Sequence, residues 1–99
     1  MTTVERMTMS GLEFFQKMLA GEYQPPPMLQ LLGVTLVEVE YGRVVFTARV
    51  EDRFYNGTGV AHGGFAATLL DTALGCAINS TMPVGKRFTT LELKVNLTR

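Results

Sequence analysis

A chain of 99 residues with nine basic and nine acidic side chains has the length of one domain and no net charge. Hydrophobic residues make up 46% of it, which excludes an intrinsically disordered segment, and the balanced charge excludes a basic nucleic-acid-binding surface. Residues 1–99 are therefore expected to form a single domain, whose near-zero charge favours self-association.

The sequence carries no pattern typical of export or membrane insertion. Cys76 is the single cysteine, so an internal disulfide is excluded, as is typical of a reducing compartment. Residues 1–10 include Glu5 and Arg6 and lack the continuous apolar core of a signal peptide. No apolar run approaches the roughly 18 residues of a membrane span. We therefore expect a cytoplasmic protein with neither a membrane nor a nucleic-acid partner.

The first predicted element is a helix over residues 11–20. Ser10 is placed to cap its N-terminus, and Glu13 completes a capping box three residues later. Gly21 ends the helix. Three prolines then favour an extended segment, and residues 28–32 are expected to form one helical turn. The apolar stripe of the first helix consists of Phe14, Phe15, Met18 and Leu19.

A change of hydrophobic period from 3.6 to 2 predicts an antiparallel hairpin over residues 34–50. In its first strand, Val37 and Val39 are expected to share one face. The connection is Tyr41-Gly42, because glycine readily adopts the positive φ that such turns require. The apolar face of the second strand consists of Val44, Phe46, Ala48 and Val50.

The second half of the chain predicts a long helix followed by a strand. Residues 63–81 have apolar side chains all round the helix axis, which is typical of a buried helix. Residues 88–99 alternate between apolar and polar side chains, which predicts a strand. Three strands cannot wrap a helix that is apolar on every side. We therefore expect further sequence or a partner chain to supply more sheet.

Asp71 is the only formally charged side chain in residues 57–85. An isolated ionised carboxylate is costly in an apolar setting, so such groups are paired, hydrogen-bonded or shifted in pKa. A desolvated carboxylate is also typical of a general base or nucleophile. On this pattern alone, a position on a wet helix edge explains Asp71 equally well.

His62-Gly63-Gly64 comes immediately before the long helix. A helix N-terminus exposes backbone N–H groups and carries partial positive charge, which suits it to hold a developing oxyanion. A flexible junction between loop and helix is the simpler alternative. Cys76 fits a small core residue better than a nucleophile, and no His or Cys cluster has the spacing of a metal site.

The separation of His62 and Asp71 constrains any site that uses both. Nine residues of helix correspond to about 900° of rotation and about 13 Å along the axis, which places the two side chains on opposite sides. One chain then cannot aim both at one carbonyl. A shared site must combine His62 of one subunit with Asp71 of another, and two-fold symmetry makes two such sites.

The same residues resemble the hot-dog-fold thioesterases of the phenylacetic-acid-degradation (PaaI-like) group. That group carries an Asn, a short glycine-containing loop, His-Gly-Gly, and an Asp nine residues after the His. Here these are Asn56, His62-Gly63-Gly64 and Asp71. The resemblance covers roughly the C-terminal two-thirds of the chain, and the combined spacing is far more specific than any single piece.

The resemblance implies an α+β hot-dog fold, in which a curved antiparallel sheet wraps a long central helix. It implies assembly into a homodimer or homotetramer and hydrolysis of acyl-CoA thioesters with no metal or other cofactor. Asp71 is implied to be the general base or nucleophile, and the Gly63 N–H to polarise the thioester carbonyl. His62 would orient that loop or help to bind the carbonyl, and Asn56 would hold substrate or water opposite Asp71.

Gly64 and Thr90 are implied to contact the substrate. Thr90 matches a position where the group often places Ser or Thr beside the Asp, with Thr89 as the alternative register. Members of the group continue with further strands, so this chain is expected to be truncated after its third strand. The alternatives are a non-catalytic acyl-CoA-binding protein and an inactive truncated member that serves only in assembly. A hot-dog dehydratase tends to carry a His-Phe-Pro segment and a helical Glu, and neither occurs here.

Overall fold

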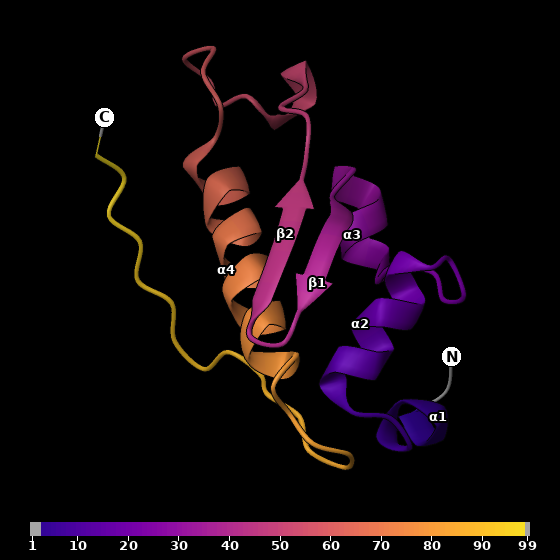
Figure 1. Ribbon diagram of the computed structural model, residues 1–99. Coiled ribbons are helices and arrows are strands. Elements are labelled where there is room, and N and C mark those ends of the chain that lie inside the picture. Colours follow the sequence, from indigo (N-terminus) through magenta and orange to yellow (C-terminus); the bar gives the residue numbers. More distant parts are fainter. Residues whose placement is uncertain (1–2, 99) are drawn as a thin grey trace.

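The computed structural model describes residues 3–98 and has an α+β architecture built around a hairpin and a long helix (Figure 1). The elements in chain order are α1 (Thr3–Met7), α2 (Gly11–Leu19), α3 (Pro27–Leu32), β1 (Thr35–Glu40), β2 (Arg43–Thr47), the 3-10 turn η1 (Asp52–Phe54) and α4 (Gly63–Asn79). Helix α2 packs against β1 and α4 packs against β2, so the hairpin lies between the N-terminal helices and the long helix. None of the helices in residues 3–98 is long and apolar enough to cross a membrane.

The hydrophobic core lies mainly between the N-terminal helices and the hairpin. Among residues 3–98, five of the six buried hydrophobic side chains precede β1 in the chain, and the sixth belongs to α4. The better-packed part of the protein is therefore the N-terminal part. The six side chains are Met9, Phe15, Met18, Leu29, Val34 and Phe65.

The capping box predicted at the start of α2 is confirmed. Ser10 Oγ accepts a hydrogen bond from the Glu13 N–H at 3.2 Å, and the Ser10 N–H donates to Glu13 Oε1 at 3.4 Å. These two bonds satisfy backbone donors that a helix terminus leaves without intrahelical partners. The helix ends at Leu19, one residue before the predicted end.

Helix α3 confirms the predicted turn and begins one residue earlier, at Pro27. Proline suits the first position of a helix because its missing N–H would have no intrahelical partner there. Gly33 ends α3 with φ of 68°, in the left-handed region that favours glycine. Leu29 is buried in the core, whereas Met28 and Leu32 line a cavity together with residues of α4.

The predicted hairpin is confirmed, but β1 contains a bulge. Val37 is the extra residue between the paired positions Leu36 and Glu38. Its side chain is 46% exposed, whereas Val39 is partly buried. The predicted common face of Val37 and Val39 is therefore wrong, because the bulge interrupts the alternation of side-chain directions between them.

The hairpin turn is fastened to the end of α4. Gly42 has φ of 76°, and its N–H donates a 2.8 Å hydrogen bond to Ser80 Oγ. The Ser80 hydroxyl in turn donates to the Ala77 carbonyl at 2.6 Å, and Ser80 is only 1% exposed. Strand β2 ends at Thr47, three residues before the predicted end, because β1 offers it no further partner.

The long helix α4 is confirmed but is less buried than its apolar sequence predicts. It ends at Asn79, two residues before the predicted end, and Phe65 is its fully buried side chain. The hairpin covers one side of α4 and residues 88–98 lie along another (Figure 1). The prediction of complete burial is wrong for these residues, since two strands and one extended segment cannot enclose a helix. An exposed apolar stripe follows α4 at four-residue intervals through Leu70, Leu74 and Ile78.

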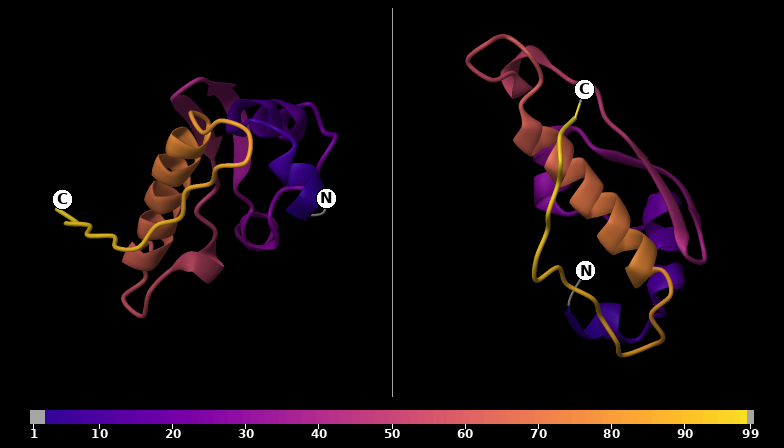
Figure 2. Two further views of the ribbon diagram at one scale, coloured as in Figure 1. Left: turned by 90° about the horizontal axis from the view of Figure 1, so that it is seen from below. Right: turned by 90° about the vertical axis from the view of Figure 1, so that its left-hand side faces the viewer.

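The third strand, predicted over residues 88–99, is not formed in the described residues 88–98, and Arg99 lies outside the described range. Instead, an extended segment runs antiparallel to α4, on the side away from the hairpin (Figures 1 and 2). Its Phe88 lies beside Gly75 of α4, and its Leu97 lies beside Gly63. A strand needs a neighbouring backbone for its hydrogen bonds, and a helix offers none. The sheet described by residues 3–98 therefore has two strands where the sequence predicts three.

Candidate active site

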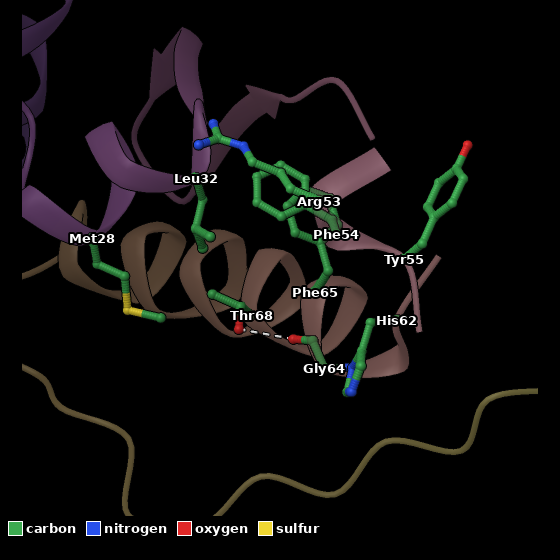
Figure 3. Close-up of a pocket in the computed structure, with 9 residues that line it drawn as sticks. All are labelled: Met28, Leu32, Arg53, Phe54, Tyr55, His62, Gly64, Phe65 and Thr68. Atoms are coloured by element: carbon green, nitrogen blue, oxygen red, sulfur yellow. Dashed lines mark hydrogen bonds between the residues drawn. The ribbon is translucent and has the colours of Figure 1, made fainter. Parts of the chain in front are cut away.

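Two neighbouring cavities lie along α4, and Met28 of α3 contributes to the walls of both. The first has a volume of about 340 Å³ and lies at the N-terminal end of α4 (Figure 3). The second has a volume of about 280 Å³ and follows the C-terminal half of the helix. The first is lined by Met28, Leu32, Arg53, Phe54, Tyr55, His62, Gly64, Phe65 and Thr68. The second is lined by Pro26, Met28, Leu29, Asp71, Thr72, Gly75, Cys76, Asn79, Phe88, Thr89 and Thr90.

His62 caps the N-terminus of α4 in the first cavity. Its Nδ1 accepts a 2.8 Å hydrogen bond from the Gly64 N–H, so this nitrogen carries no proton in the observed arrangement. The Gly64 N–H is thereby occupied. Gly63 is the first residue of α4, and its N–H has no intrahelical partner. Of the two glycines, Gly63 therefore has the N–H without an intrahelical partner, but Gly64 and not Gly63 lines the first cavity.

Asn56 orders the loop that leads to His62. Its Oδ1 accepts hydrogen bonds from the Thr58 N–H at 2.9 Å, the Thr58 hydroxyl at 2.7 Å and the Val60 N–H at 3.3 Å. The Asn56 N–H also donates to the Val60 carbonyl at 2.8 Å. Asn56 lines neither cavity, and its side-chain oxygen is engaged within the loop. The structure thus places Asn56 in the loop before His62, with only its amide nitrogen left for a substrate or water.

An aromatic pair and one cation form the outer wall of the first cavity. The rings of Phe54 and Phe65 stack with centroids 4.4 Å apart, which ties η1 to the start of α4. Arg53 lies over the Phe54 ring at 4.9 Å and pairs with Glu51 at 2.7 Å. The permanently charged group of this cavity, Arg53, is therefore at its solvent-exposed rim (Figure 3).

Asp71 and Thr90 meet in the second cavity. The Thr90 hydroxyl donates a 2.7 Å hydrogen bond to Asp71 Oδ1, so the predicted register, and not the one with Thr89, brings a hydroxyl to the carboxylate. Asn79 fixes the segment that carries Thr90: its Oδ1 accepts from the Phe88 N–H at 2.9 Å, and its Nδ2 donates to the Phe88 carbonyl at 3.4 Å. The hydrogen bonds between Asn79 and Phe88, two residues before Thr90, thus help to fix the position of Thr90.

Cys76 lines the same cavity but does not have the properties of a nucleophile. Burial, and after it the negative charge of Asp71, raise the pKa of the Cys76 thiol from 9.0 to about 11. The thiol is therefore protonated at neutral pH, and a protonated thiol is a poor nucleophile.

The structure keeps the two halves of the predicted site apart. His62 and Gly64 line the first cavity, whereas Asp71 and Thr90 line the second. The predicted rotation of His62 to the opposite side of the helix does not apply, because His62 has extended backbone angles (φ −65°, ψ 132°) and lies outside the helical turn. The separation along the axis remains, since seven helical residues between Gly64 and Asp71 span about 10 Å.

Comparisons with known proteins show what this chain resembles. Residues 58–99, which include His62, Gly63 and Asp71, match the family described as the Thioesterase superfamily. This part of the chain is therefore similar to that superfamily. It is 35% identical over 77 residues to a Halobacterium salinarum protein named "Putative esterase", across 73% of this chain and 51% of that protein. The chain thus spans about half the length of the curated relative it matches.

The structure is also similar to that of the E. coli PaaI protein from the phenylacetic acid degradation operon. The TM-score is 0.58 with 27% sequence identity, over 74% of this chain and 51% of the PaaI chain. The predicted α+β hot-dog fold is therefore confirmed. The long helix α4 and the antiparallel hairpin are the parts of that fold that residues 3–98 contain.

Two residues of the site were not predicted from the sequence. Met28 lines both cavities, but its place there depends on how α3 packs on α4, which no local pattern reveals. Asn79 forms hydrogen bonds with the Phe88 backbone, and its place in the site could have been predicted. Gly75 and Asn79 follow Asp71 at four-residue intervals and therefore share its helix face.

Proposed function

We propose that this chain takes part in the hydrolysis of acyl-CoA thioesters to a free acid and CoA. The observation that carries the proposal is the Asp71 carboxylate, which lines a largely apolar cavity and accepts a hydrogen bond from Thr90. A carboxylate in such a place is suited to activate water or to attack a carbonyl. Its lone thiol, Cys76, favours the reducing cytoplasm as the compartment of the reaction.

In the general-base form of the mechanism, Asp71 removes a proton from water while the water oxygen attacks the thioester carbonyl carbon. The negative charge that develops on the carbonyl oxygen is stabilised by the Gly63 N–H at the helix N-terminus. The tetrahedral intermediate then collapses, the C–S bond breaks, and the sulfur leaves with the proton from Asp71.

In the nucleophilic form, an Asp71 oxygen attacks the carbonyl carbon and the CoA thiolate leaves. This produces a mixed anhydride on Asp71, which water then hydrolyses to the free acid. In a single turnover in water enriched in oxygen-18, label in the Asp71 carboxylate identifies the nucleophilic form with attack of water on the aspartyl carbonyl, because the general-base form puts label only in the free acid.

The proposed site uses two subunits. His62 and Asp71 line separate cavities in one chain, with about 10 Å of helix between Gly64 and Asp71. We therefore place His62 and Gly63 of one subunit opposite Asp71 of its partner in a homodimer, which forms the smallest unit of a homotetramer. The exposed apolar stripe of α4 supports association, since such surfaces favour contact with further protein. In this arrangement the Asn56 amide nitrogen holds substrate or water opposite the partner's Asp71.

Release of free thiol from a panel of short, long and aryl acyl-CoA esters tests the proposal. Hydrolysis of at least one ester, and its loss on Asp71→Asn, supports it. Tight binding of the same esters without thiol release contradicts hydrolysis and supports a non-catalytic acyl-CoA-binding protein. Asp52→Asn is the matched control, because this exposed aspartate of η1 lines neither cavity.

A further inference from the structure

The two cavities follow one continuous face of α4. Gly64 and Thr68 line the first, and Thr72, Gly75 and Asn79 line the second. These residues succeed one another at intervals of three or four, which places them in one row along the helix. The floor of the first cavity therefore continues into the floor of the second.

Met28 stands where the two cavities meet. It is the residue that contributes to both linings, and in Figure 3 it lies at the end of the first cavity opposite His62. Its side chain reaches α4 from the first turn of α3 and is 56% exposed. An unbranched and largely exposed methionine can fill a gap between two cavities without itself being essential to the core.

Asn79 and Phe88 line the second cavity at the C-terminal end of α4. Asn79 bonds both the N–H and the carbonyl of Phe88, so the segment is fastened to α4 at this point. The cavity is also small: about 280 Å³ is just below the range of about 300–1,000 Å³ for small-molecule sites. An acyl chain whose carbonyl lies at Asp71 and which outgrows this space can continue toward the first cavity, where Met28 stands in its path.

We infer that Met28 sets the upper limit of acyl-chain length at the Asp71 site. The inference rests on the proposed function, since it takes the second cavity as the place of the acyl group. Short acyl groups fit the second cavity as it stands. Longer acyl groups need the two cavities to join into one groove, which happens when the Met28 side chain is removed.

Binding of 2-oxoalkyl-CoA thioethers tests this inference separately from catalysis. These compounds keep the carbonyl and the alkyl chain of the substrate, but have a methylene between sulfur and carbonyl and cannot be hydrolysed. Calorimetry with chains of increasing length should show affinity rising about fourfold per buried methylene until the cavity is full. In Met28→Ala the rise should continue to longer chains, and affinity for the longest thioether should exceed that of the wild type by 10-fold or more. In Met28→Phe the plateau should come at the same or a shorter length.

Leu31→Ala is the matched control, because Leu31 lies on the same helix, is 67% exposed and lines neither cavity. It should leave the plateau unchanged, and thermal melting should show that all variants fold.

An unchanged plateau in both Met28→Ala and Met28→Phe would overturn the inference, as would a wild-type protein that binds no thioether. Hydrolysis of the matching thioesters is read out separately. Thiol release with an unchanged plateau overturns the inference alone, whereas a shifted plateau without thiol release overturns the proposed function alone.

Discussion

The Thr90 hydroxyl donates a 2.7 Å hydrogen bond to Asp71 Oδ1, across 19 positions of the chain. The bond joins the extended segment of residues 88–98 to the middle of α4, at the one charged side chain of the second cavity. A hydrogen bond to a carboxylate oxygen fixes the orientation of the carboxylate plane. Thr90 is thus placed to position Asp71 as well as to contact a substrate.

Thr90→Val should lower kcat/KM for acyl-CoA hydrolysis by about 10-fold or more. Valine keeps the branched shape but removes the donor, and a hydrogen bond to a charged group is worth about 1.5–3 kcal/mol. Thiol-release kinetics measure the effect. Thr90→Ser keeps the hydroxyl and should recover most of the activity. If the serine variant were as impaired as the valine variant, Thr90 would act through its packing beside Gly75 and not through its hydroxyl.

Asp71→Asn should reduce turnover by at least about 10²–10⁴, because the amide keeps the shape of the side chain and loses the base. The fold should persist, since Asp71 forms none of the ion pairs seen in residues 3–98. Thiol release and a thermal melt measure the two effects, with Asp52→Asn as the control for loss of one negative charge. Near-normal turnover in Asp71→Asn would show that the carboxylate has a structural role.

A mixture of inactive His62→Ala and inactive Asp71→Asn proteins should regain activity after subunit exchange. In a mixed dimer with shared sites, one site carries both lesions and the other carries neither. The recovered rate should follow the fraction of mixed dimer, which native mass spectrometry can measure. A mixture that exchanges fully but stays inactive would indicate a site built within one chain.

The Cys76 thiol should react slowly with iodoacetamide at about pH 8.5, because only its thiolate reacts and its pKa is raised to about 11. Asp71→Asn removes the second cause of that shift, so the pKa should fall and alkylation should become several-fold faster. Asp52→Asn should leave the rate unchanged. The folded state favours the neutral thiol, so this contribution to stability is present below about pH 9 and is lost as the pH rises to about 11. Equal alkylation rates in both variants would show that Asp71 carries no charge near the thiol.

The start of α2 could be predicted from the sequence, because Ser10 and Glu13 have the fixed spacing of a capping box. The meeting of Asp71 with Thr90 could be predicted only from the resemblance to the PaaI-like group, since alternation does not tell which helix residue Thr90 faces. The bulge at Val37 could not be predicted from the sequence. Both possible phases of the strand alternation place an apolar side chain toward the core, so the pattern does not mark the extra residue.

Three further features depend on packing between elements or on the conformation of a loop. Residues 88–98 have the alternation of a strand, but a strand also needs a partner backbone, and α4 stands beside them instead. The place of Met28 between the cavities depends on the packing of α3 against α4. The engagement of the Asn56 oxygen depends on the loop conformation and not on its place in the motif. Composition and periodicity carry no information on these three points.

Ser80→Ala should lower the free energy of unfolding by about 1–2 kcal/mol. Ser80 is almost fully buried, and its oxygen accepts the Gly42 N–H of the hairpin turn at 2.8 Å, so alanine leaves that donor without its acceptor. Urea unfolding at neutral pH measures the change. Thr81→Val is the matched control, because it removes the exposed hydroxyl bond to the Ile78 carbonyl at 2.6 Å and keeps the methyl group that lies beside Gly42. If the two variants lost equal stability, the link from Ser80 to Gly42 would contribute nothing beyond local helix capping, and the hairpin would be held to α4 by apolar packing alone.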